Sequence, residues 1–241
     1  MSKNLLLLSS SKFADSGYLT HALPFIQTFL SKVEPIKPDG PLIFIPFAGV
    51  SVEYDDYEKM VQTAFAEIGS EIKSIHHFKD KQSAIKNASG IVVGGGNTFA
   101  LLDALYQNEL IGPIQQLINN GTPYIGWSAG SNIAAPSIKT TNDMPIVEPA
   151  SFDAFGFLPF QINPHYIEGN PPGHNGETRQ QRLEEFLIKN PSSKIVAIPE
   201  GSAIQLQNQH LQFIGPKSGF LFSLKQKLSI NSTSDLQGLL N

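Results

Sequence analysis

The residues most able to do chemistry lie in a Gly-Trp-Ser-Ala-Gly pentapeptide at positions 126–130, with Ser128 at its centre. The pentapeptide follows a short apolar run, Tyr124–Gly126, and precedes Ile133, where a helix could start. A sharp turn from a strand into a helix exposes a serine hydroxyl at the carboxyl edge of a sheet, and flanking glycines relieve crowding there. The motif therefore predicts Ser128 as a nucleophile. A close-packed turn without chemistry is the competing interpretation, because short Gly/Ser motifs also occur by chance.

A serine nucleophile needs a base, and His165 is the histidine best placed to act as one. Pro164 fixes the chain directly before this imidazole, and His165 closes the long segment that begins after the serine. His174, in a Pro/Gly-rich loop, is the competing candidate. Surface or core roles are more common for the remaining histidines, which lie at a strand end (His76 and His77), in a helix (His21) and in a hairpin turn (His210).

An acid must then orient the imidazole. Asp143 lies in a polar stretch, residues 140–145, and Glu200 directly follows the apolar run Ile195–Ile198. Parallel sheets place functional groups at the carboxyl ends of their strands, and Glu200 lies at such a position. The spacing does not decide between Asp143 and Glu200. Two further acids, Glu148 and Asp153, lie in the same long segment as Asp143.

A second glycine cluster, residues 94–96, predicts part of an oxyanion hole. Backbone N–H groups near Gly95 and Gly96 could face the serine together with the N–H of Ala129, which begins the predicted helix. A phosphate-binding turn is one alternative. Phe99, however, occupies the position where a dinucleotide-binding motif carries its third glycine, and no P-loop lysine follows. A plain tight turn is the other alternative.

The elements that must position these residues alternate along the chain. Strand-helix alternation predicts an α/β fold, a mostly parallel sheet with helices on both faces. The segment from Thr140 to Pro172 breaks the alternation and predicts a long excursion over the sheet, and Ala203–Ile214 predicts an antiparallel hairpin. The expected strands are the apolar runs 5–8, 42–46, 72–75, 91–93, 124–126 and 195–198, and the expected helices are 18–30, 54–68, 99–106 and 111–118.

Composition limits the class of protein. The 241 residues, 41% hydrophobic and 16% charged, are typical of a globular chain, and we expect one α/β domain over residues 1–241. The net charge of -4 predicts no nucleic-acid partner. No run approaches the ~20 apolar residues of a membrane helix, so we expect no membrane association and a cytoplasmic location. The absence of cysteine excludes thiolate chemistry. The sequence does not predict an oligomeric state.

Several longer blocks resemble the peptidase E family of alpha-aspartyl dipeptidases. The resemblance implies a fold like that of class I glutamine amidotransferases, with serine in place of their cysteine. It implies Ser128 and His165 as nucleophile and base, while Asp143 and Glu200 both fall on positions proposed for the acid. It also implies hydrolysis of Asp-Xaa dipeptides without metal or other cofactor. The blocks are residues 43–50, 93–99, 126–130, 140–147, 161–165 and 176–179.

An N-terminal aspartyl peptide brings a side-chain carboxylate and a free ammonium into the site. Arginine suits the carboxylate, because its planar guanidinium binds it in bidentate fashion. The two arginines of the chain, Arg179 and Arg182, stand at the start of a helix that Thr178 and Gln181 would cap. We expect Arg179 to bind the substrate, although helix arginines more often pair with neighbouring acids or solvent. Candidates for the ammonium are Glu177 and Asp143.

Other functions compete with this one. Cyanophycinases share the serine turn and also cut next to aspartate. An esterase of the α/β-hydrolase type has the order Ser, acid, His with a late histidine, whereas His165 comes early. A nucleotide- or ligand-binding module built on residues 94–96 belongs to a different class altogether.

Overall fold

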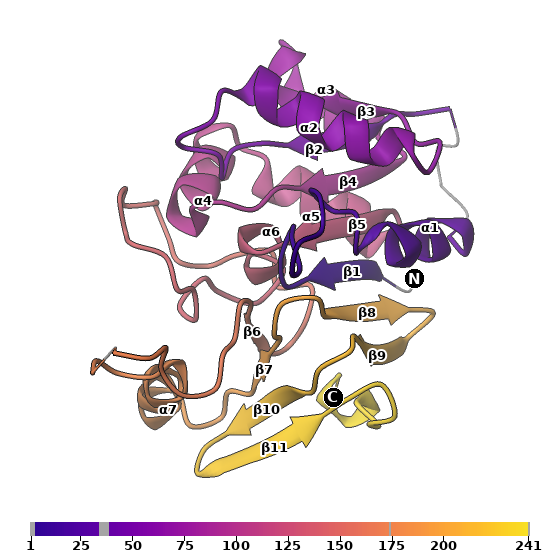
Figure 1. Cartoon of the computed structure of the whole chain (residues 1–241). Helices are drawn as coiled ribbons and strands as arrows, with labels where there is room; N and C mark the ends of the chain where they lie inside the picture. Colours follow the sequence, from indigo (N-terminus) through magenta and orange to yellow (C-terminus); the bar gives the residue numbers. More distant parts are fainter. Residues whose placement is uncertain (1–2, 34–38, 174, 241) are drawn as a thin grey trace.

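The structure is a computed structural model that describes residues 3–33, 39–173 and 175–240 (Figure 1). His174, the competing candidate for the base, lies outside the described residues. The described residues form two sheets, and the chain belongs to the α/β class, as the strand-helix alternation predicted. Within the described part of the chain, no helix combines the length and the apolar character needed to cross a bilayer.

The larger sheet has seven strands and is parallel except at one edge. Its interior strand β1 is buried on both faces, because Leu5 and Leu7 enter one apolar cluster while Leu6 and Leu8 enter another. The arrows of β1, β4 and β5 point to the same edge of the sheet, which brings the loops after them together (Figure 1). The strands, in spatial order, are β3 (Ile72–Ser74), β2 (Leu42–Ile45), β4 (Gly90–Val93), β5 (Pro123–Trp127), β1 (Asn4–Leu8), β8 (Ala203–Gln207) and β9 (His210–Ile214).

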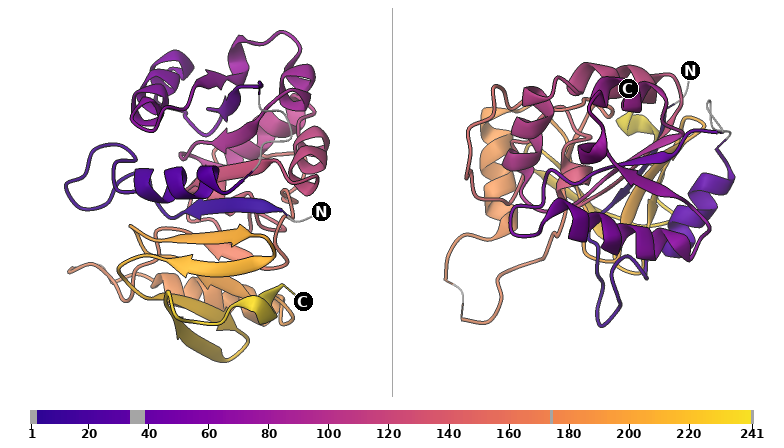
Figure 2. Two further views of the ribbon diagram at one scale, coloured as in Figure 1. Left: turned by 90° about the vertical axis from the view of Figure 1, so that its right-hand side faces the viewer. Right: turned by 90° about the horizontal axis from the view of Figure 1, so that it is seen from above.

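Helices cover both faces of the larger sheet (Figure 2). Helices α1 (Leu23–Ser31) and α2 (Tyr54–Ala66) bury their apolar residues in the cluster that contains Leu6 and Leu8. Helices α3 (Lys81–Lys86), α4 (Thr98–Gln107) and α5 (Ile111–Asn119) contribute to the cluster on the other face. This double covering explains why the strands are continuous apolar runs rather than alternating ones.

The smaller sheet was not expected from the sequence, which predicted one sheet that included residues 195–198. Strand β7 (Ile195–Ala197) instead pairs in parallel with β6 (Gln161–Asn163) and antiparallel with β10 (Gly219–Ser223), which pairs with β11 (Gln226–Ile230). Helix α7 (Arg179–Lys189) packs Leu183 and Leu187 on this sheet. The chain passes between the two sheets from β5 to β6, from β7 to β8 and from β9 to β10 (Figure 1).

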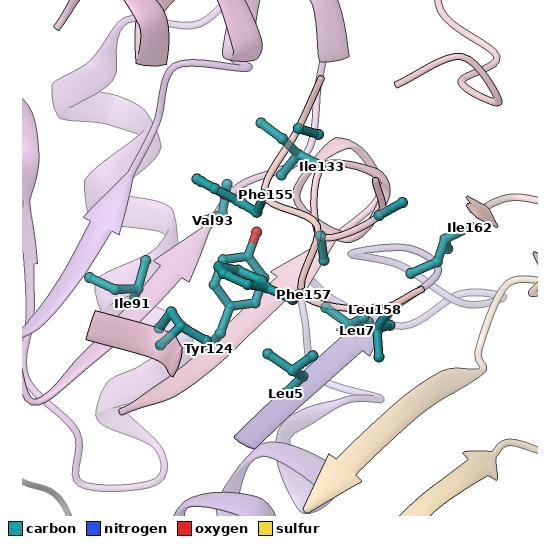
Figure 3. Packing of buried hydrophobic residues seen from close by; sticks show 14 of the residues in the cluster. Leu5, Leu7, Ile91, Val93, Tyr124, Ile133, Phe155, Phe157, Leu158 and Ile162 are labelled. Atoms are coloured by element: carbon teal, nitrogen blue, oxygen red, sulfur yellow. The ribbon is translucent and has the colours of Figure 1, made fainter. Parts of the chain in front are cut away.

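Of the predicted excursion, residues 140–172, the part before β6 packs on the larger sheet, whereas Gln161–Asn163 within it form β6 of the smaller sheet. Phe155 and Phe157 lie against Tyr124 of β5, with ring centroids 6.0 and 5.3 Å from the tyrosine ring (Figure 3). Both phenylalanines are 2% exposed, and burial of such a side chain stabilises a fold by about 1.5–3 kcal/mol. Apolar contact therefore holds a segment that has almost no regular secondary structure.

Two predicted helices differ from the structure. Helix α1 begins at Leu23 rather than near residue 18, because Leu19 has φ of 59°, which a right-handed helix cannot contain. The helix behind the serine, α6 (Ala129–Asn132), has only four residues and ends before Ile133, where the sequence placed its start. Pro136 disfavours helical conformation at Ala135, the residue before it, and so limits how far this helix can extend.

Candidate active site

Ser128 stands between β5 and α6 with φ of 53° and ψ of -114°. Few non-glycine residues adopt positive φ, and those that do often lie at functional sites. The flanking glycines permit the turn. A Cβ on Gly126 would come within 2.3 Å of Gly130 O, and a Cβ on Gly130 within 2.2 Å of Val93 O. Glycine at both positions therefore lets α6 lie directly on strands β4 and β5.

Buried hydrogen bonds fix the backbone around Ser128. Its N–H donates to Leu8 O at 3.2 Å. The hydroxyl of Ser131, which is fully buried, lies 2.6 Å from Leu8 O and 2.9 Å from Gly126 O. Tyr124 donates its hydroxyl to Gly130 O at 2.6 Å. The turn is thus held from β1 and β5 before any substrate binds.

His165 follows β6 of the smaller sheet, and its side chain reaches Ser128, which follows β5 of the larger sheet. Its Nε2 lies 2.9 Å from Ser128 Oγ. The backbone N–H of His165 donates to Ser9 Oγ at 2.8 Å, and Ser9 Oγ in turn donates to Ile198 O at 2.9 Å. His165 also has positive φ, 54°. Its imidazole is partly exposed, so a proton can be exchanged with solvent.

Glu200 contacts the other nitrogen of His165, with Oε1 2.9 Å from Nδ1. The pairing of β6 with β7 brings them together, because Asn163 is in register with Ala197 and both side chains follow those strand ends. A backbone bond from Tyr166 N–H to Ile198 O, 3.1 Å long, extends this pairing past the strands. With Nδ1–H donating to Glu200, Nε2 is left to accept the proton of the serine hydroxyl.

Asp143, the other predicted acid, lies elsewhere in the site. Its Oδ2 accepts hydrogen bonds from Thr98 N–H at 2.7 Å, Thr98 Oγ1 at 2.6 Å and Thr141 Oγ1 at 3.1 Å. Among the described residues it makes no hydrogen bond to His165. Glu148 is exposed, and Asp153 pairs with Ser137 in an isolated β-bridge. Of the four candidate acids, the structure brings only Glu200 to the imidazole.

The glycine loop after β4 lies against Ser128. A Cβ on Gly95 would come within 3.0 Å of the Ser128 Cβ, and Tyr57 donates its hydroxyl to Gly95 O at 2.9 Å. Gly96 has φ of 136°, and a Cβ there would meet Ala48 O at 2.1 Å. The Gly95 and Gly96 N–H groups have no acceptor among the described residues. The N–H of Ala129, first in α6, is likewise outside the helical bonding pattern.

Arg179 borders a cavity of about 210 Å³ that opens on Ser128. Burial lowers the pKa of the Arg179 guanidinium, and Arg182 adds to this, while the carboxylates of Asp143 and Glu200 oppose it. Arg182 pairs instead with Glu177, 3.8 Å away, and both side chains are exposed. Thr178 and Gln181 form the predicted capping box, which places Arg179 in the first turn of α7. The rest of the lining is Thr98, Ala129, Asn132, Thr141, Asn142, Asp143, Pro164 and His165.

Asn132 is a residue of this cavity that the sequence analysis missed. It is 1% exposed, and its Nδ2 donates to Ile162 O at 2.7 Å. Its Oδ1 has no partner among the described residues, although it is buried. Buried polar atoms are almost always hydrogen-bonded, so a free acceptor beside the cavity calls for a donor. The available signal was its position four residues after Ser128, on the same side of the turn.

A second cavity of about 490 Å³ is also lined by Ser128. It is largely apolar and is lined in part by Tyr18, Tyr57 and Trp127, of which the Tyr18 ring contacts the other two. Val50 and Ile146, 61% and 51% exposed, stand at its mouth. Ser128 thus has one small polar cavity and one larger apolar cavity beside it.

Comparison with known proteins shows the family to which the chain belongs. The model of peptidase family S51 matches residues 5–214. The chain is 51% identical to peptidase E of Haemophilus influenzae over 91% of this chain and 99% of the relative. It is 48% identical to peptidase E of Shewanella denitrificans over the full length of both chains.

A solved structure supports the fold alone. A peptidase from an acI-B1 actinobacterium superposes with a TM-score of 0.68 at 18% identity, covering 95% of this chain and 98% of that one. Together with the family match, these findings confirm the resemblance that the sequence motifs indicated. The chain belongs to peptidase family S51, and it is a hydrolase of peptide bonds.

Proposed function

We propose that this peptidase hydrolyses dipeptides with an N-terminal aspartate, with Ser128 as nucleophile, His165 as base and Glu200 as the acid that orients His165. The observation that carries the proposal is the line of contacts from Glu200 Oε1 through His165 to Ser128 Oγ, with 2.9 Å at each step. Nucleophile, base and orienting group within hydrogen-bond reach of one another are the recurring arrangement of serine hydrolases.

The reaction proceeds in two halves. Ser128 Oγ attacks the aspartyl carbonyl carbon while His165 Nε2 takes the hydroxyl proton, and the N–H groups of Gly95, Gly96 and Ala129 stabilise the oxyanion. The C–N bond breaks as His165 returns the proton to the leaving amine. A water molecule then loses a proton to His165 and attacks the acyl ester, which releases aspartate and restores Ser128. No step requires a metal or another cofactor.

The polar cavity supports the preference for aspartate. Arg179 supplies a cation for the side-chain carboxylate of the substrate. All the hydrogen bonds that Asp143 accepts go to Oδ2, which leaves Oδ1 for the ammonium of the substrate, and the free Oδ1 of Asn132 is a second acceptor. The cation of Arg179 thus matches the side-chain carboxylate of a free N-terminal aspartyl residue, and the two acceptors match its ammonium. The apolar cavity suits the residue that follows it.

The test is hydrolysis of Asp-Leu beside Glu-Leu, Asn-Leu and Leu-Leu in the presence of a chelator, with wild-type protein and Ser128→Ala. We expect cleavage of Asp-Leu alone, and its loss in the alanine variant. Cleavage of all four peptides would contradict the specificity, and cleavage that survives Ser128→Ala would contradict the mechanism. If the folded wild-type protein cleaves none of them, polymers that contain aspartate become the better substrate class.

A further inference from the structure

Four possible metal ligands gather at a site that the proposed reaction does not use. Asp55 and Glu58 lie in the first turns of α2, and His76 and His77 lie in η1 (Ile75–His77), the short 3-10 helix that follows β3. We call these four residues the α2–η1 cluster. One ligand atom from each lies within 4.8 Å of the other three. None of them lines either cavity beside Ser128.

The donor atoms of the α2–η1 cluster converge from both elements. His76 Nε2 lies 2.8 Å from Asp55 Oδ1, and His77 Nε2 lies 3.7 Å from the same oxygen. His77 Nε2 also lies 2.6 Å from Glu58 Oε2. Around a tetrahedral zinc ion with bonds of about 2.0–2.2 Å, neighbouring ligand atoms are separated by about 3.3 Å. The observed separations span this value, so small side-chain rotations suffice to admit an ion.

Contacts behind the ligands hold two of them in place. Ser74 Oγ lies 2.6 Å from His76 Nδ1, and Ser74 N–H donates to Glu58 Oε1 at 2.7 Å. The Glu58 side chain is 10% exposed, and the Tyr54 ring lies 5.6 Å from the His76 ring. A hydrogen bond to the second imidazole nitrogen and another to the second carboxylate oxygen are typical of ligands around metals, because such bonds fix their orientation.

We propose that Asp55, Glu58, His76 and His77 bind one divalent transition-metal ion, with zinc the best match. Two imidazoles and two carboxylates form a ligand set that suits zinc rather than calcium or magnesium, which prefer oxygen. The Ser74 hydroxyl can donate or accept, so His76 can present Nε2 either as N–H to Asp55 or as a lone pair to a cation. The ion would neutralise the two carboxylates and tie the start of α2 to the segment after β3.

The test is a zinc titration of the full chain after removal of metal with a chelator. We expect one equivalent to bind, and the unfolding midpoint to rise by about 5–10 °C at a hundredfold excess over Kd. The double variant Asp55→Asn with His77→Ala changes two exposed ligands, and we expect its affinity to fall at least about tenfold. His210→Ala is the matched control, because its histidine is exposed and lies outside the cluster; it should bind as the wild type does.

A second control addresses the active site, where His165 and Glu200 could also attract zinc. His165→Ala removes that pair, and the one-equivalent site should persist. Cobalt substitution gives a further measurement, since tetrahedral cobalt(II) absorbs visible light strongly and the double variant should lack this signal. Absence of stoichiometric binding by the wild type, equal affinity in the double variant, or loss of the site in His165→Ala would each overturn the proposal.

Discussion

Ser128 and His165, whose Oγ and Nε2 atoms lie 2.9 Å apart, both have left-handed backbone conformations, with φ of 53° and 54°. Such a conformation costs about 1–3 kcal/mol at a non-glycine residue and persists only where the surroundings enforce it. Here the surroundings include the hydrogen bonds that the Ser128 and His165 N–H groups donate to Leu8 O and Ser9 Oγ. The relative positions of Ser128 and His165 are therefore set by the backbone and not only by side-chain rotamers.

The two predicted acids are expected to give different kinetic effects. Glu200→Gln removes the charge that stabilises the His165 imidazolium, so kcat should fall by about 10²–10⁴ with little change in KM. Asp143→Asn, the isosteric control, should mainly raise KM, because its carboxylate faces the cavity of the substrate. Steady-state kinetics with Asp-Leu distinguish the two. The opposite pattern would assign the orienting role to Asp143.

The two arginines offer a matched pair of substitutions on one helix. Arg179→Lys keeps a positive charge but loses the planar fork, so kcat/KM for Asp-Leu should fall about tenfold to a hundredfold, as for a lost charged hydrogen bond. Arg182→Lys should change it less than about twofold, because exposed pairs such as that with Glu177 contribute little. An equal loss of activity in both variants would mean that the substitutions disturb helix α7 as a whole, and that Arg179 has no special part in binding substrate in the cavity.

Gly130→Ala should damage both fold and activity. Its Cβ would meet the backbone of β4 at Val93 O, so α6 must move outward, and the free energy of unfolding should fall by about 1–3 kcal/mol. Gly112→Ala in α5 is the control, because a Cβ there meets nothing within 4 Å and should stabilise by up to about 1 kcal/mol. Urea unfolding measures both. Equal stability of the two variants would contradict the close packing of α6 on β4.

His21 should make the protein sensitive to acid. Burial lowers the pKa of its imidazole, the Glu200 carboxylate opposes this, and its buried Nδ1 has no partner among the described residues. The unfolded chain takes up the proton first as pH falls below about 6.5, so the free energy of unfolding should decrease there. Denaturant unfolding between pH 7.5 and 5.5 should show a smaller decrease in His21→Gln. If the free energy of unfolding depends on pH in the same way in the wild type and in His21→Gln, then His21 has the same pKa in the folded and the unfolded chain.

Most of the larger sheet could be predicted because its strands are apolar on both faces. Strand β6 could not, because Gln161 and Asn163 are polar yet buried. Gln161 donates to Ser137 Oγ at 2.9 Å and Asn163 to Thr140 O at 2.8 Å, so the long segment, and not an apolar partner, satisfies these side chains. The hydrophobic periodicity of a sequence does not reveal hydrogen-bond partners that lie twenty or more residues away.

The candidate site, too, depends in part on long-range contacts that the sequence does not reveal. Ser128 and His165 carry local signals, a glycine-flanked turn and a preceding proline, and the structure brings these two predicted residues within 2.9 Å of each other. The choice of Glu200 over Asp143 depends on the parallel pairing of β6 with β7, a long-range contact without a local signature. Asn132 stands out only once its unpaired Oδ1 and the adjacent cavity are known.

The catalytic groups proposed here are divided between the two sheets, with Ser128 after β5 in one, and His165 and Glu200 after β6 and β7 in the other. With this arrangement, the rate of peptide cleavage depends on how the two sheets are positioned relative to each other. If the proposed roles are right, we expect substitutions in β10 or β11, far along the chain from Ser128, to slow turnover by shifting the smaller sheet while the larger core stays folded. Enzymatic assays of such variants would detect misalignments too slight to alter a melting curve.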